Sequence, residues 1–144
     1  MLRGIPPLLT PDLLHALAAM GHGDTIAIVD ANFPASSVGR RVVELPGATS
    51  AAVLEAVLQV MPLDDFALPC ALTMEMVGHP QIRPPAVEAF VAILERYASG
   101  SVNPGHLERM QFYERARHAF AVVRTGDRQP YANVLLVKGV IGPD

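Results

Sequence analysis

The sequence is short of cysteine and of charge, and each shortage excludes a class of function. Cys70 is the single cysteine among 144 residues, so an intramolecular disulfide and a cysteine-based zinc site are excluded. Charged residues make up 17% of the chain and the net charge is −3, which predicts no bulk attraction to nucleic acid or to an anionic membrane. No apolar run reaches the roughly 18 residues of a membrane span. The N-terminus also lacks the apolar core of a signal peptide, and together these features predict a soluble cytoplasmic protein.

Apolar side chains are abundant, at 51% of the residues. That fraction excludes a disordered chain, because enough apolar surface can be buried to offset the entropy of ordering. The length predicts a single domain over residues 1–144. The apolar content exceeds what a lone small domain needs, so part of this surface is expected to be buried against other copies of the chain.

Segments with helical periodicity alternate with β-type apolar runs. Thr10-Pro11-Asp12 provides a helix start, with a capping hydroxyl, a proline at the first helical position and an acidic group near the positive helix end. Helices are predicted from Thr10 to Gly21, over 49–61, after Pro84-Pro85 and over 106–117, and strands over 24–30, 41–45, 71–77, 119–124 and 131–138. This alternation predicts an α/β fold.

The first candidate functional stretch is Gly21-His22-Gly23-Asp24, which precedes a buried strand ending at Asp30. A histidine between two glycines is open to a ligand and can exchange a proton near neutral pH. Asp30 lies at the carboxyl end of its strand, where α/β sheets usually place ligand sites. Local spacing alone favours a simpler interpretation, in which Gly21 caps a helix, His22 is an exposed turn residue and Asp30 caps a loop.

Two further stretches carry polar groups. Arg109 and Tyr113 are four residues apart and can share one helix face, where the guanidinium could bind neighbouring hydroxyls or a carboxylate. Tyr131-Ala132-Asn133 opens the last predicted strand and offers a phenol and an amide. On spacing alone, the Arg109 stretch also fits a solvent-exposed helix with Glu–Arg pairs. The Tyr131 stretch also fits the ordinary first residues of a strand.

Taken in order, these motifs resemble the D-ribose pyranase and L-fucose mutarotase family, whose members are small cytoplasmic sugar isomerases. The resemblance extends from Leu8 to Val140 and is carried by Gly21-His22-Gly23-Asp24, Asp30-Ala31-Asn32-Phe33-Pro34, Arg109 with Phe112-Tyr113-Glu114-Arg115-Ala116, Tyr131-Ala132-Asn133 and Lys138-Gly139-Val140. Gly23, Arg109 and the Phe112-Tyr113 pair resemble the fucose branch. Asn32 and Ala132 depart from it, since that branch often has His and Gly there.

The resemblance implies a three-layer α/β sandwich with a central mixed, mostly parallel sheet. It implies ring-shaped homo-oligomers, commonly decamers, with sites at subunit contacts. His22 matches the catalytic histidine of the family, and the sugar-binding positions are matched by Asp30, Arg109, Tyr131, Ala132 and Asn133. No cofactor and no metal are expected, because anomer exchange moves only protons.

The expected activity is therefore exchange of the anomers of L-fucose or a related monosaccharide, with His22 as proton donor and acceptor. Tyr131 is a candidate second acid, and Phe33 a candidate contact for the methyl group of a 6-deoxy sugar. Two alternatives stay open: a D-ribose pyranase, and a non-catalytic protein for sugar binding or transport. A metal site from His22, Asp24 and Asp30 is disfavoured, because no second histidine stands at ligand spacing from His22.

Overall fold

Within residues 1–66, 68–98 and 100–143, which the computed structural model describes, six strands pair into one sheet. Its order is β2-β5-β1-β6-β3-β4. The strands are β1 (Thr25–Val29), β2 (Val42–Leu45), β3 (Ala71–Met74), β4 (Gly105–Leu107), β5 (Ala121–Thr125) and β6 (Val134–Val137). The helices are α1 (Pro11–Ala19), α2 (Ala35–Val38), α3 (Ser50–Leu58), α4 (Pro85–Tyr97) and α5 (Arg109–His118). The predicted α/β class is confirmed.

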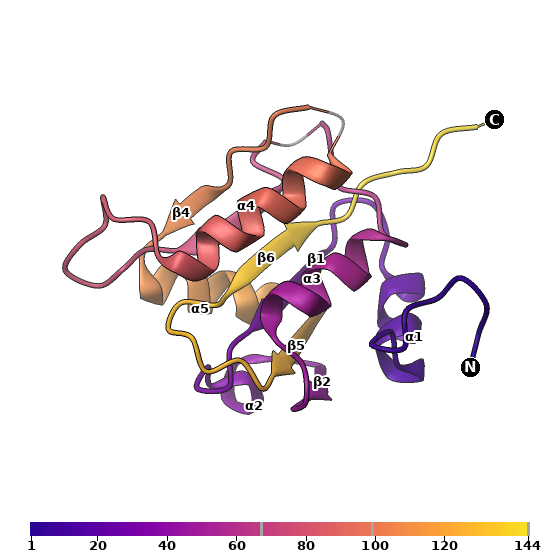
Figure 1. Ribbon diagram of the computed structural model, residues 1–144, viewed down its shortest axis with the longest axis horizontal. Coiled ribbons are helices and arrows are strands. Elements are labelled where there is room, and N and C mark those ends of the chain that lie inside the picture. The colour runs from indigo at the N-terminus through magenta and orange to yellow at the C-terminus, as the bar shows by residue number, and fades with distance from the viewer. Residues whose placement is uncertain (67, 99, 144) are drawn as a thin grey trace.

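Helices cover both faces of the sheet. Alternation along β1 sends Ile26 and Ile28 into an apolar cluster with α1, α3 and α4, and sends Ala27 and Val29 into a second cluster with α2 and α5. In Figure 1, α3 and α4 lie in front of the sheet and α5 lies behind it. Because both faces are buried there, the strands β1, β3 and β6 are apolar almost throughout. The three-layer sandwich is confirmed.

The strand directions give the sheet two distinct ends. β1 is parallel to β5, β5 to β2 and β3 to β4, whereas β6 runs antiparallel to both β1 and β3. Five strands therefore point the same way and β6 points the opposite way, so the sheet is mixed and mostly parallel, as expected. We call the end where the five strands finish the carboxyl end, and the opposite one the amino end. Residues just before β6 lie at the carboxyl end.

The element boundaries differ from the sequence-based expectation around the third and fourth strands. β3 ends at Met74 rather than residue 77, and the three-residue strand β4 occupies the start of the helix predicted over 106–117. His106 therefore lies in a strand and not at a helix start. A strand this short carries too little alternation to be recognised in the sequence. The short helix α2 was also missed, since no element was predicted between the strands over 24–30 and 41–45.

Two expectations about single features can be compared with the described part of the chain. The position of Cys70 beside the strand predicted over 71–77 favours a small buried apolar side chain, and Cys70 is a free, buried cysteine. Among the described residues, no helix combines the length and the apolar character that crossing a bilayer needs.

Candidate active site

His22 lies at the amino end of the sheet, in the loop that joins α1 to β1. Gly23 has φ +82°, a conformation that favours glycine, and the Asp24 carboxylate accepts a 2.7 Å hydrogen bond from the Gly21 amide. These two features close a tight turn on either side of His22. The histidine side chain is 48% exposed, so its ring is accessible to a ligand.

A buried carboxylate orients this ring. His22 Nε2 lies 3.2 Å from Asp64 Oδ1, and the Asp64 side chain is only 3% exposed. The same oxygen accepts a hydrogen bond from the Phe66 amide, and the Phe66 ring packs edge-on against the imidazole with centroids 5.8 Å apart. An ionised carboxylate can only accept, so this contact places the proton on Nε2 and leaves the Nδ1 lone pair of neutral His22 free.

At the carboxyl end, Asp30 and Asn133 are paired twice. The Asp30 amide donates to Asn133 Oδ1, and Asn133 Nδ2 donates to Asp30 Oδ2, both at 2.9 Å. The other Asp30 oxygen accepts from the amides of Asn32 and Phe33. Both side chains are buried. Asp30 thus closes the turn after β1 and fixes the segment that precedes β6.

Tyr131 lies beside this pair with strained backbone. Its φ of 62° is uncommon for a bulky residue, and such strain persists only where the surroundings impose it. The Tyr131 hydroxyl accepts a 3.0 Å hydrogen bond from the Val77 amide, and its own proton has no acceptor among the described residues. Ala132, the next residue, is completely buried. Tyr131 is the accessible member of the Tyr131-Ala132-Asn133 stretch.

Arg109 lies at the same end, as the first residue of α5. Glu108 caps this helix by accepting from the amides of Met110 and Gln111, which sets where α5 begins. Arg109 is exposed, and no described acidic group pairs with it. One turn later, the Tyr113 ring packs against Phe33 with centroids 5.0 Å apart.

The apolar surface at this end differs from the expectation. Phe33, the candidate contact for a sugar methyl group, is only 4% exposed and packs among other aromatic rings. Val77 and Met110 are among the large apolar side chains that are exposed here. Phe33 therefore supports the site from beneath rather than lining its surface.

The structure brings together some of the predicted site residues and separates His22 from the rest. Asp30 and Asn133 are in contact, and Arg109 and Tyr131 lie at the same carboxyl end. His22 lies beyond the amino end of β1, and the five residues of that strand alone span about 17 Å. One monosaccharide therefore cannot touch His22 and Arg109 of the same copy.

Asp64 is the site residue that sequence reasoning missed. It lies 42 residues from His22, in the segment after α3, and no local pattern links the two. Its sequence neighbours Pro62, Leu63 and Asp65 resemble an ordinary loop. Only the path of the chain places it against the imidazole.

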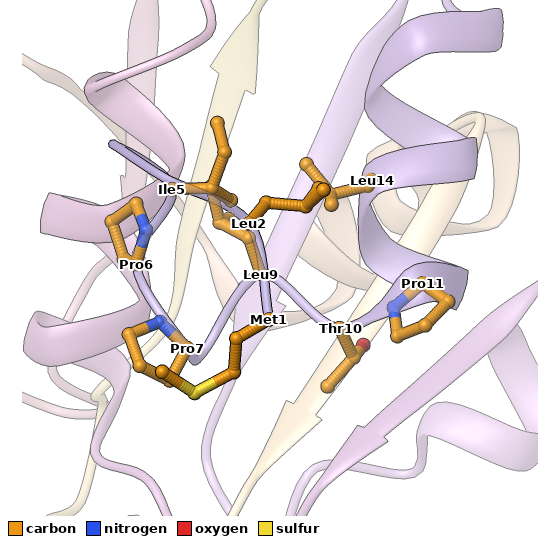
Figure 2. A pocket seen from close by; sticks show the side chains of 9 residues that line it. All are labelled: Met1, Leu2, Ile5, Pro6, Pro7, Leu9, Thr10, Pro11 and Leu14. Carbon is orange, nitrogen blue, oxygen red and sulfur yellow. The ribbon is translucent and has the colours of Figure 1, made fainter.

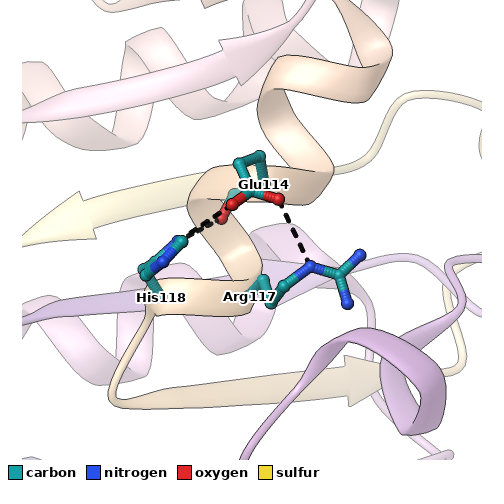
Figure 3. Close-up of polar contacts among 3 residues, drawn as sticks. All are labelled: Glu114, Arg117 and His118. Carbon is teal, nitrogen blue, oxygen red and sulfur yellow. Dashed lines mark hydrogen bonds and ion pairs between the residues drawn. The ribbon is translucent and has the colours of Figure 1, made fainter.

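Two other surface features are a mostly apolar hollow and a cluster of exposed polar side chains. Nine residues line a hollow at the N-terminus (Figure 2): Met1, Leu2, Ile5, Pro6, Pro7, Leu9, Thr10, Pro11 and Leu14. Of these nine, only Thr10 has a polar side chain, and its hydroxyl caps α1. Glu114 contacts Arg117 and His118 on α5, where all three are exposed (Figure 3). Among the described residues, no three His, Cys, Asp or Glu side chains are placed to hold a metal ion.

The sequence and fold match known proteins over nearly the whole chain. Residues 3–141 match the model of the RbsD / FucU transport protein family. The chain is 44% identical over 147 residues to a protein of Homo sapiens named fucose mutarotase, covering 97% of this chain and 94% of the human one.

Two solved structures share the fold. The Streptococcus pneumoniae fucose mutarotase, crystallised in complex with L-fucose, superposes with a TM-score of 0.92 at 34% identity and covers 98% of this chain and 100% of that one. Bacillus subtilis RbsD, crystallised with D-ribose, gives a TM-score of 0.72 at 24% identity, covering 99% and 100% of the two chains. The latter similarity shows the fold alone.

Proposed function

Because the chain belongs to the RbsD/FucU family, we propose that it is an isomerase of the L-fucose mutarotase type, which interconverts the α and β anomers of L-fucose. The observation that carries the proposal is the accessible His22, paired with a buried Asp64, in a chain that aligns with fucose mutarotases over nearly its whole length. The pair supplies proton transfer, which is the chemistry that anomer exchange requires.

The reaction needs one proton removed and one delivered. The neutral His22 ring takes the proton of the anomeric hydroxyl at Nδ1, while the bond between C1 and the ring oxygen breaks and that oxygen takes a proton from an acid. Rotation about C1–C2 and closure on the other face reverse both transfers. Tyr131 is the proposed acid, because its hydroxyl proton is free to point at a ligand.

We propose that two copies of the chain form each site, with His22 from one and the carboxyl-end residues from the next. The placement of these groups at opposite ends of the sheet supports a head-to-tail contact, which can close into a ring. Apolar surface supports it as well: Phe66 and Leu68 are 76% and 80% exposed at the amino end, and Val77 and Met110 are both 59% exposed at the carboxyl end. A homo-oligomer follows, and a decamer is the assembly proposed from the family resemblance.

The proposed sugar contacts divide into exposed and buried groups. Arg109 and Tyr131 reach the sugar directly, with the planar guanidinium bridging adjacent hydroxyls. Asp30, Ala132 and Asn133 form the buried support beneath them.

The cytoplasm is the proposed location, and fractionation of cells that express the protein tests it.

Exchange spectroscopy by NMR on L-fucose at anomeric equilibrium tests the function. We expect catalytic amounts of protein to accelerate exchange between the two anomers. We expect His22→Ala to lower the rate by about 10²–10⁴-fold, the range that general acid–base catalysis supplies. Wild-type exchange no faster than buffer, with fucose still bound, would instead favour a binding protein. Faster pyranose–furanose exchange of D-ribose than anomer exchange of L-fucose would favour a pyranase.

A further inference from the structure

The loop that carries His22 is held from the end of β6. Lys138 Nζ donates to the carbonyls of Leu17 and Met20, at 2.8 and 2.6 Å, where α1 ends. The backbone of Lys138 adds two bonds, since its carbonyl accepts from the Gly23 amide and its amide donates to the Asp24 carbonyl, both at 2.9 Å. One residue therefore anchors the chain on both sides of His22.

The same short segment also holds Asp64. The Asp64 amide donates to the Val137 carbonyl at 3.0 Å, and the Gly139 amide donates to the Pro62 carbonyl at 2.8 Å. Leu63 and Lys138 form an antiparallel bridge between these bonds. Residues 137–139 thus lie between the His22 loop and the Asp64 segment, and they set the separation of the two.

The contact between Gly139 and the segment that carries Asp64 leaves no room for a side chain at residue 139. A Cβ at Gly139 would lie 2.3 Å from the Leu63 carbonyl oxygen, a distance that real Cβ atoms do not show. Since Gly139 accepts no side chain, the 62–64 segment packs directly on the backbone after β6. Residues 138 and 139 therefore contact the Asp64 segment directly, as Lys138 contacts the His22 loop.

We propose that Lys138 is a positioning residue that keeps His22 paired with Asp64. Lys138 is the only lysine of the sequence, and α1, residues 11–19, has no basic residue in its own last turn. The ammonium thus brings a cation to a helix C-terminus, where it is favoured, and bonds two carbonyls that the helix leaves unpaired. The catalytic consequence rests on the proposed function, whereas the geometric one does not.

A Lys138→Met variant tests the proposal, because it keeps the aliphatic length and removes the donors. In ¹⁵N-histidine NMR at about pH 8, where neutral imidazole dominates, we expect wild-type His22 to hold its proton on Nε2. In the variant we expect a mixture of the two tautomers. With L-fucose we expect kcat to fall about 10–100-fold and KM to change little, because a small misplacement of a reacting group costs rate. The His22 signal is identified by its loss in His22→Gln.

Two comparisons separate positioning from general damage. Arg117→Met removes one cation from the exposed Glu114–Arg117 pair (Figure 3), and it should leave both the His22 spectrum and kcat unchanged. Lys138→Arg keeps the charge and the donors, so this variant should retain most of the Nε2–H tautomer of His22. A folded Lys138→Met variant with an unchanged His22 spectrum would overturn the proposal.

A measurement on the wild-type protein applies even if Lys138→Met does not fold. Because the chain has one lysine, ¹⁵N-lysine labelling gives a single side-chain ammonium signal. We expect its protons to exchange with water more slowly than those of free lysine, and equal exchange would overturn the proposal. Failure of the proposed function looks different: wild-type protein would not accelerate fucose exchange, while the His22 and Lys138 signals would still report the anchor.

Discussion

At the scale of single residues, the imidazole and the carboxylate of the His22–Asp64 pair have opposite environments. The imidazole is half exposed, so a ligand can reach it, while the carboxylate is almost fully buried and held by a second hydrogen bond from the Phe66 amide. A fixed acceptor of this kind selects one tautomer of the ring. The other ring nitrogen is then free to act as the base that the proposed mechanism requires.

Replacing Asp64 with asparagine should therefore impair catalysis more than it impairs folding. An amide can donate to Nε2, which favours the wrong tautomer, and we expect about a 100-fold lower rate of fucose anomer exchange. NMR exchange rates measure this, and the melting temperature reports folding. Asp65→Asn, at the exposed neighbouring position, is the matched control and should retain wild-type exchange. Equal rates in the two variants would contradict a role for Asp64.

Cys70 should be chemically inert in the folded protein. Burial raises the pKa of the Cys70 thiol, which leaves less of the reactive thiolate at a given pH. We expect alkylation by iodoacetamide at about pH 8 to be far slower than for a free thiol of ordinary pKa. Mass spectrometry follows the reaction, and the same protein in urea should react at the ordinary rate. Equally fast alkylation of the folded protein would contradict the burial of this thiol.

Sequence reasoning at this scale succeeded where a residue's local neighbours determine its environment. The glycines beside His22 predicted an exposed ring, and the position of Cys70 beside a predicted strand predicted its burial. Partners distant in sequence were beyond reach, because Asp64 is 42 residues from His22 and Asn133 is 103 residues from Asp30. The roles assigned to the six site residues stay predictions.

At the scale of elements, the start of α5 fixes where Arg109 lies. The helix was predicted from residue 106, but β4 occupies residues 105–107 and Glu108 is the cap. The capping box satisfies backbone amides at the helix start, so Arg109 is the first helical residue and its side chain leaves the helix at the carboxyl end of the sheet. Helical periodicity predicted the element but not this boundary, which depends on pairing between β4 and β3.

Removing the Glu108 cap should weaken the first turn of α5. We expect Glu108→Ala to lower the free energy of unfolding by about 1 kcal/mol, as measured by urea denaturation, and to raise KM for fucose because Arg109 is less well placed. Glu114→Ala, on the same helix, removes only exposed pairs and should cost less than about 0.5 kcal/mol. An effect of Glu114→Ala as large as that of Glu108→Ala would contradict the capping role.

At the scale of the whole molecule, the sheet separates the two halves of the proposed site. The alternation of helical and β-type segments predicted the α/β class, and the family resemblance implied the three layers, which the apolar clusters on the two faces of the sheet confirm. The separation follows from strand direction, since His22 precedes β1 and Asp30 follows it, and it was implicit in the sequence order. What the sequence could not provide was Asp64 beside His22, or the exposed apolar side chains that lie at each end.

The most direct test of a site shared between copies combines two inactive variants. We expect His22→Gln and Arg109→Ala each to abolish most of the acceleration of L-fucose anomer exchange. When the two chains are co-expressed and assemble at random in equal amounts, a contact between copies restores both groups in about a quarter of the sites. Exchange spectroscopy should then show about a quarter of wild-type activity in the mixture. A mixture no more active than either variant alone would contradict the shared site.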